Sequence, residues 1–248
     1  LALTLLFVYG CKKGEDEKSS DKPAKVESKR IPIDQATVAT IRGQVLFEGE
    51  VPSPKEIVLR GDPVCNKAHE NPIYFDTLLV KDGAVQNAFV WIKEGLEDYD
   101  FPKSTEEVIV DQKGCIYSPR VVGVQVGQPV VFVNSDATNH NIHTVPKKGP
   151  GLNFSMPKQG MRSVRKLRRQ EVMLKTKCDV HPWMGAWIGV LRHSAFAVTG
   201  KDGTFHISGV PPGDYQLGVW HEKLGTHTKK ITLKASGEES VDFTLKLP

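Results

Sequence analysis

The sequence predicts an all-β protein, and two observations support this fold class. Helical periodicity is hard to find after residue 36, whereas short runs rich in Val, Ile, Phe and Thr recur along the chain. Gly, Pro, Asp and Asn separate these runs at the spacing that is typical of sandwich strands. We therefore expect a central β-sandwich flanked by small β-sandwich modules. The net charge of +4 is too small to indicate a nucleic-acid partner.

Residues 1–11, LALTLLFVYGC, form a short apolar run that ends at Cys11. Ten apolar residues are too few to span a bilayer, so the run indicates the remnant of a secretory signal. Its end, VYGC, resembles a bacterial lipobox, which implies lipidation of Cys11 and an exported, membrane-anchored lipoprotein in the periplasm or at the cell surface. A signal that is cleaved elsewhere is the alternative. Residues 12–36 are rich in charge, and we expect a disordered tether there.

Three β segments follow the tether. Residues 37–106 form an N-terminal β module whose Asp82-Gly83 pair suits a tight hairpin turn. Residues 107–193 carry the histidine and cysteine motifs described below. Residues 194–248 contain TGKDGTFHISGVPPGDY, with a second Asp-Gly turn and a Pro-Pro-Gly corner. This pattern resembles the carboxypeptidase regulatory-like module, a transthyretin-like β-sandwich, and the resemblance implies a structural role.

The cysteines can be assigned if the protein is exported. Cys11 belongs to the lipobox and Cys178 to a metal-binding motif, which leaves Cys65 and Cys115. An oxidising compartment favours a disulfide between these two residues. Two separate buried thiols are the alternative.

The segment CDVHPWM places Cys178, His181 and Met184 at three-residue intervals. Pro182 and Gly185 oppose a helix, whereas a tight turn between two strands can direct the three side chains towards one point. A thiolate, an imidazole and a thioether together suit copper in both of its oxidation states. Structural zinc more often binds to four cysteines or histidines. The motif therefore predicts a copper ion.

A trigonal copper site needs one more imidazole, from a separate strand. The segment VVFVNSDATNHNIHT runs from a strong strand into a polar turn that carries His140 and His143. On a regular strand, side chains three residues apart face opposite sides. Only one of these two histidines is expected to face Cys178.

Residues 107–193 resemble a cupredoxin, the Greek-key β-sandwich of type 1 blue copper proteins. Two separated motifs carry this resemblance: the strand pattern around Val126-Gly127 and Asn134, which leads to His140-Asn141-Ile142, and the segment CDVHPWM, which is closest to the short ligand loop of the amicyanin group. The resemblance implies four ligands of one copper ion and one neighbour of these ligands. The equatorial ligands would be His140, Cys178 and His181, the weak axial ligand Met184, and the neighbour Asn141, which would hydrogen-bond the cysteine sulfur and tie the two ligand loops together.

The resemblance also implies an electron port, where the ring edge of His181 reaches the surface inside an apolar patch. Pro182, Trp183 and Trp187 are the candidates to build this patch. We therefore expect an electron carrier and not an enzyme, with no small-molecule substrate and no nucleic acid. Its partners would be redox proteins of a respiratory chain, such as a cytochrome c or a terminal oxidase.

Two other functions compete with this one. A copper delivery or sensing protein could use the same ligands, although extended Met- or His-rich tracts are absent from the sequence. A nitrite-reductase-like copper enzyme would need a second histidine cluster, and His193, His221 and His227 are too scattered to supply one.

The remaining residues of interest have ordinary interpretations. The basic run from Arg162 to Arg169 predicts a solvated face, with docking of an acidic partner as the alternative. Met156 and Met161 are expected to fill gaps in the core. We interpret the other histidines as surface or strand residues, namely His69, His206, His221 and His227. For His69, which follows Cys65 by four residues, a second metal site is the alternative.

Overall fold

A computed structural model describes residues 30–59 and 61–248, and it confirms the all-β fold class. Cys11 and most of the predicted tether lie outside the described residues. Strand β1 (Ile31–Pro32) lies within the segment that was expected to be a disordered tether, and it differs from that expectation by pairing in parallel with β6 (Tyr99–Asp100). In the described part of the chain, no helix has both the length and the apolar character that crossing a membrane requires.

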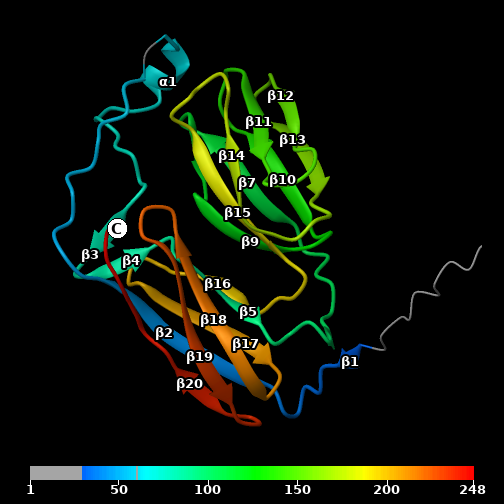
Figure 1. The fold of residues 1–248 in the computed structure, drawn as a ribbon. Helices are drawn as coiled ribbons and strands as arrows, with labels where there is room; N and C mark the ends of the chain where they lie inside the picture. The colour runs from blue at the N-terminus through cyan, green and yellow to red at the C-terminus, as the bar shows by residue number, and fades with distance from the viewer. Residues whose placement is uncertain (1–29, 60) are drawn as a thin grey trace, which may run out of the picture.

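The first of two β-sandwiches is built from both ends of the chain (Figure 1). One sheet has the order β16-β5-β18-β19, and the other has the order β17-β2-β4-β3, with β20 and β21 also paired to β2. The strands are β2 (Ala39–Phe47), β3 (Leu79–Lys81), β4 (Ala84–Gln86), β5 (Phe89–Glu94), β16 (Phe196–Val198), β17 (Thr204–Val210), β18 (Gly213–His221), β19 (Gly225–Leu233), β20 (Glu238–Ser240) and β21 (Phe243–Leu245).

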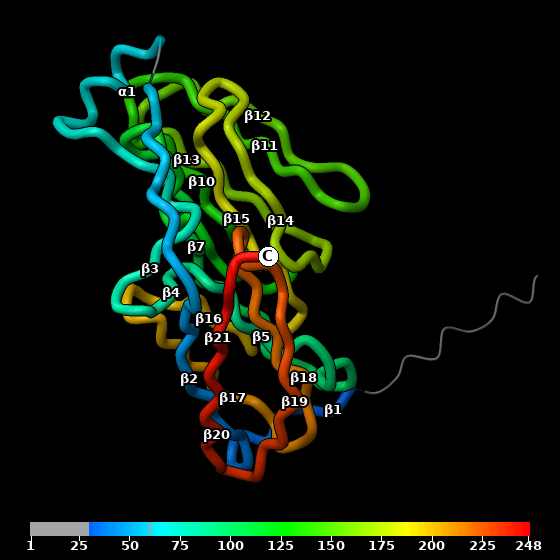
Figure 2. The backbone as a smooth tube through the Cα atoms, turned by 60° about the vertical axis from the view of Figure 1, so that its left-hand side comes forward, coloured from blue at the N-terminus to red at the C-terminus, as the bar shows by residue number. Residues whose placement is uncertain are grey.

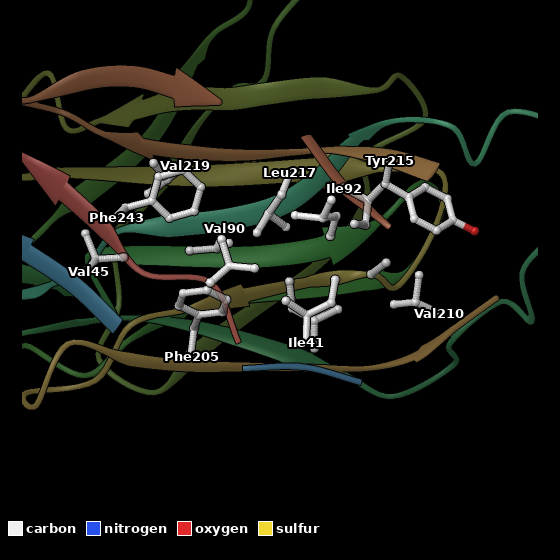
Figure 3. Packing of buried hydrophobic residues seen from close by; sticks show 14 of the residues in the cluster. Ile41, Val45, Val90, Ile92, Phe205, Val210, Tyr215, Leu217, Val219 and Phe243 are labelled. Atoms are coloured by element: carbon white, nitrogen blue, oxygen red, sulfur yellow. The ribbon is translucent and has the colours of Figure 1, made fainter. Parts of the chain in front are cut away.

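This pairing differs from the expectation of separate modules at 37–106 and 194–248. Strand β5 lies between β16 and β18, and β2 pairs with β17, β20 and β21. Ile41 and Val90 from one segment and Phe205 and Leu217 from the other fill one core (Figure 3). A sheet must bury its apolar face against another layer, and here each segment supplies strands that the other needs. The two segments therefore form one sandwich.

The second sandwich consists of residues from the predicted copper-binding segment 107–193. Its sheets have the orders β13-β10-β7-β8 and β12-β11-β14-β15-β9, and they combine antiparallel pairs with the parallel pairs β7–β10 and β9–β15. The strands are β7 (Val108–Lys113), β8 (Ile116–Ser118), β9 (Val121–Gln125), β10 (Pro129–Asn134), β11 (His140–Val145), β12 (Asn153–Met156), β13 (Met161–Lys166), β14 (Glu171–Lys177) and β15 (Gly185–Leu191).

Between β2 and β3 the chain leaves the first sandwich and reaches the second one. Figure 2 shows it rising from β2 to helix α1 (Pro63–Lys67) and returning to β3. Asp62 caps this helix by accepting hydrogen bonds from the backbone of Val64 and Cys65, and Pro63 suits its first turn. Cys65 is fully buried in the core of the second sandwich. We call the described residues of this segment, 51–59 and 61–78, the excursion.

The two sandwiches pack through a small apolar cluster that includes Phe89 and Leu191. Two glycines of the second sandwich leave room for aromatic rings of the first. A Cβ atom at Gly189 would lie 2.4 Å from the Phe89 ring, and one at Gly123 would lie 2.3 Å from the Phe196 ring. The backbone of β9 and β15 therefore approaches these rings more closely than any side chain would permit.

We predict that Gly189→Ala destabilises the protein, because the added methyl group overlaps the packed Phe89 ring. The free energy of unfolding should fall by about 1–3 kcal/mol, as for overpacked cores. Denaturant unfolding measures this change. Gly185→Ala in the same strand is the matched control, since the nearest atom to its Cβ is 3.9 Å away. Equal stability of the two variants would contradict this account of the interface.

His193, just after β15, predicts a pH dependence of stability. Its ring is buried against Phe101, and its Nδ1 atom has no hydrogen-bond partner among the described residues. Burial lowers the pKa of His193 from 6.5 to about 4. The unfolded chain therefore binds a proton at this histidine more readily than the folded chain does. The free energy of unfolding is unaffected by the histidine above pH 6.5, and it falls as the pH drops from 6.5 towards 4.

We expect this loss to reach about 3 kcal/mol for the single histidine. His193→Gln should flatten the fall in stability between these pH values, as measured by denaturant unfolding at each pH. His206→Gln is the control, because His206 is exposed in the first sandwich. An unchanged pH profile in His193→Gln would show that other groups cause the fall.

Candidate metal centre

The predicted ligands lie on two neighbouring elements of one sheet. His140 is the first residue of β11, and β11 pairs with β14, which ends just before Cys178. The segment between β14 and β15 is a tight turn. The backbone N–H of Cys178 donates to the carbonyl of Met184 at 3.3 Å, and that of Met184 donates to the carbonyl of His181 at 2.9 Å. This turn has the form that the sequence predicts.

The structure brings three candidate donor atoms together. One atom from each of His140, Cys178 and His181 lies within 4.8 Å of the others. The Nδ1 atoms of the two imidazoles are 2.9 Å apart, and the cysteine Sγ is 3.9 Å from Nδ1 of His181. All three side chains are buried, and Met184 is buried in the same core cluster. The two sequence motifs, around His140 and around Cys178, therefore come together at one buried position.

The surroundings of Cys178 favour the thiolate, which is the form that binds metals. Burial raises the pKa of this thiol, but contacts with His140 and with the backbone N–H groups of Asn141, His181 and Val180 outweigh burial and lower the pKa. The N–H of His181 lies 3.4 Å from the sulfur. The turn itself thus supplies donors for a negatively charged sulfur.

Asn141 connects the two ligand loops. Its side-chain Oδ1 accepts a hydrogen bond from the N–H of Asp179 at 2.6 Å, and its Nδ2 donates to Asp179 Oδ2 at 3.1 Å. His143 lies outside the donor group. Its Nδ1 is 2.8 Å from the same carboxylate, near the surface. Only one histidine of the pair therefore faces Cys178, as strand alternation leads one to expect.

Asp136 holds the outer nitrogen of His140. The carboxylate Oδ2 is 2.9 Å from Nε2 of the ring, and the two oxygens also accept hydrogen bonds from the N–H groups of Gly114 and Cys115. Burial lowers the pKa of His140, but contacts with Asp136 and Cys178 outweigh it and raise the pKa to about 9. Because Nε2 is paired with the carboxylate, Nδ1 is the atom that faces Cys178.

The position of His181 differs from the expected electron port. Its exposed fraction is only 2%, and the excursion covers the ring edge that was expected at the surface. Nε2 lies 3.1 Å from Asp62 Oδ2 and 3.5 Å from the sulfur of Cys65. Contacts with Thr138 first, and then with the helix backbone and His181, lower the pKa of Asp62 to about 2, so the carboxylate is charged at neutral pH.

The other residues expected at the electron port do not form one patch. They lie partly at the surface and partly between the two sandwiches. Pro182 is exposed. Trp183 is half-buried, with its ring 5.1 Å from that of His181 and its Nε1 donating to the Cys115 carbonyl at 2.9 Å. Trp187 instead packs against Trp220 of the first sandwich, with the ring centres 5.0 Å apart.

The predicted disulfide between Cys65 and Cys115 is present and fully buried. It joins helix α1 to the turn between β7 and β8. The sulfurs of the two cysteines and a ring nitrogen of His181 lie within 4.8 Å of one another, so the disulfide lies directly beside the candidate donor group. The disulfide pairing could be predicted from the sequence, but no sequence pattern indicated that the disulfide lies beside His181.

The remaining residues of interest lie away from the donor group. The basic run is mostly exposed along the edge strand β13, where Arg165 packs its guanidinium 4.3 Å from the Phe154 ring. Met156 is fully buried in the second core, and Met161 is partly buried against it. The other histidines occupy a half-buried site in the excursion (His69), exposed strand positions (His206 and His227) and a buried strand position (His221).

The donor set fits copper. Two imidazole nitrogens and a thiolate, with a buried thioether in the same cluster, form a mixture of borderline and soft ligands. His140, Cys178, His181 and Met184 are the residues that would hold the ion.

Comparison with known proteins gives partial matches. A sequence model of the carboxypeptidase regulatory-like domain matches residues 181–246, and so begins earlier than the expected boundary at residue 194. No curated protein sequence matches the chain.

The solved structures that are similar to the chain include copper proteins. A reduced Cu(I) form of an amicyanin variant is 24% identical, with a TM-score of 0.31, and covers 35% of this chain and 84% of its own. A purple cupredoxin from Nitrosopumilus maritimus is 23% identical, with a TM-score of 0.28 and coverages of 34% and 98%. A Cu-containing nitrite reductase from Thermus scotoductus SA-01 is 26% identical, with a TM-score of 0.30, and the match spans 34% of this chain but only 22% of that enzyme. The chain is thus similar to cupredoxins over part of its length and to the carboxypeptidase regulatory-like domain family over residues 181–246.

Proposed function

We propose that the protein is an exported, membrane-anchored type 1 copper protein that carries single electrons between redox partners of a respiratory chain. The observation that carries this proposal is the convergence of donor atoms from His140, Cys178 and His181 within 4.8 Å, in a buried position. The expected axial ligand, Met184, belongs to the same cluster.

The chain's own residues support electron transfer because they hold the donors rigidly. Asp136 and Asp62 fix the two rings from outside, and Asn141 ties the two ligand loops. Bound copper would supply a one-electron couple between Cu(I) and Cu(II). Because these contacts hold the donor side chains in place, the donors would move little when the copper ion changes between Cu(I) and Cu(II). Burial of the donors also excludes water and substrates, whereas catalytic metals keep an open position, so we propose no enzyme activity.

The location and partners are proposed from the sequence. Lipidation at Cys11 would anchor the exported protein to a membrane. The exposed basic residues along β13 could attract an acidic surface of a redox partner, such as a cytochrome c or a terminal oxidase.

Copper reconstitution tests the proposed function. The full chain with Cu(II) should show an intense visible band from thiolate-to-copper charge transfer and a reversible one-electron wave in voltammetry. Cys178→Ser should lose both signals completely, because a hydroxyl cannot replace the thiolate as a soft ligand.

The matched control compares two histidines of the same strand. His140→Gln should weaken or abolish the band, whereas His143→Gln should keep it, because His143 points to Asp179 and away from the donor group. A colourless complex that readily releases copper to a chelator would instead favour copper delivery or sensing.

A further inference from the structure

The surroundings of Asp62 connect the excursion to both ligand loops. Oδ1 accepts hydrogen bonds from the backbone N–H groups of Val64 at 2.8 Å and Cys65 at 3.2 Å. Oδ2 accepts from the hydroxyl of Thr138 at 2.6 Å and lies 3.1 Å from Nε2 of His181. Thr138 precedes His140 by two residues, so one carboxylate contacts the loops of both histidine ligands.

We propose that the excursion is a cap over the copper site, in which Asp62 is a positioning residue that orients His181 and the Cys65–Cys115 disulfide is the staple that holds the cap in place. This inference rests on the proposed function, because it concerns the same donors. It assigns to residues outside the copper-binding sandwich a part in setting the properties of the metal.

The contact with Asp62 determines which ring nitrogen of His181 binds. A carboxylate beside Nε2 accepts a hydrogen bond from an Nε2–H group and so keeps the proton on that nitrogen. Nδ1 is then left with a lone pair directed at Cys178 and His140. The same contact makes the imidazole a stronger donor, which stabilises Cu(II) relative to Cu(I). His140 is held in the same way by Asp136, which is four residues away in the chain, whereas Asp62 is 119 residues away from His181.

The staple lies where it can keep the cap closed. Both cysteines are fully buried, and the sulfur of Cys65 is 3.5 Å from Nε2 of His181. Cys115 belongs to the turn that Asp136 holds, and its carbonyl accepts from the indole of Trp183. The disulfide therefore fixes the cap to the rigid side of the site, and water and small ligands do not reach the outer edge of His181.

The first test is Asp62→Asn in the full chain. Asparagine keeps the Oδ1 acceptor that caps α1 but places an NH2 group where Oδ2 accepts from Nε2 of His181. We expect Cu(II) affinity to fall by about 10–100-fold and the reduction potential to rise. We also expect the Nε2–H proton of His181 to exchange faster with water, as measured by NMR on the histidine-labelled chain, both metal-free and loaded with Cu(I).

Asp202→Asn is the matched control. Asp202 accepts from the N–H of Thr204 at 3.1 Å and from its hydroxyl at 2.8 Å, the same kinds of contact in a turn of the first sandwich. This variant should leave all three measurements unchanged. If Asp62→Asn also leaves affinity and proton exchange unchanged, the positioning role is refuted.

Two further variants keep the test decisive. If Asp62→Asn does not fold, Thr138→Val removes the hydroxyl that orients Oδ2 while keeping the carboxylate. Faster exchange of the His181 proton in this variant supports the proposal, and an unchanged rate overturns it. The double variant Cys65→Ser, Cys115→Ser should lose copper to a Cu(I) chelator about tenfold faster or more, because the cap opens locally; an unchanged rate would overturn the role of the staple.

Failure of the proposed function remains distinguishable from failure of this inference. A wild-type chain without the copper spectrum would refute the electron-carrier function. The exchange rate of the His181 Nε2–H proton in the metal-free chain would still decide whether Asp62 orients this ring.

Discussion

Two imidazoles and a thiol that are buried side by side must each find polar partners, and the structure around them depends on this constraint. An unpaired polar atom in such a place costs several kcal/mol, on the order of 2–7 for a full transfer out of water. The outer nitrogens therefore require acceptors, which Asp136 and Asp62 provide. Asp136 in turn shapes the turn before β8, and Asp62 starts helix α1. Each of the two carboxylates thus serves a ring nitrogen and also the backbone of a neighbouring turn or helix.

The division of the first sandwich between both ends of the chain makes this arrangement possible. The second sandwich is inserted between β6 and β16, so its two ends are held by strands of one core. Arg120 adds a second tie, since its guanidinium contacts Asp76 of the excursion at 2.7 Å and Glu222 after β18 at 2.9 Å. The excursion is consequently tied to both sandwiches near its C-terminal end, and these contacts offset part of the entropy cost of ordering a long loop.

The local motifs could be predicted from the sequence because their information is local. Cys178, His181 and Met184 occupy a single turn, and strand alternation alone separates His140 from His143. The disulfide followed from the number of cysteines and the expected compartment. By contrast, Asp62-Pro63 is an ordinary helix start, and no local pattern shows which histidine its carboxylate meets. The pairing of β2 and β5 with strands of residues 194–248 was not predicted for the same reason. The sequence of one segment does not show which distant segment its strands pair with.

In an electron carrier of the proposed kind, the covered edge of His181 would change the side from which an electron reaches the donors. Side chains that serve as an entry must contact the ligand turn and also reach solvent. The ring of Trp183 meets both conditions, because it is half-buried and lies 5.1 Å from the imidazole. Trp183 and Met184 also line one cavity of about 280 Å³, whose opposite wall is formed by excursion residues such as Ile73 and Tyr74. The excursion that covers one edge of His181 therefore also lines the cavity beside the ligand turn, so the proposed cap and the proposed electron entry depend on the same segment.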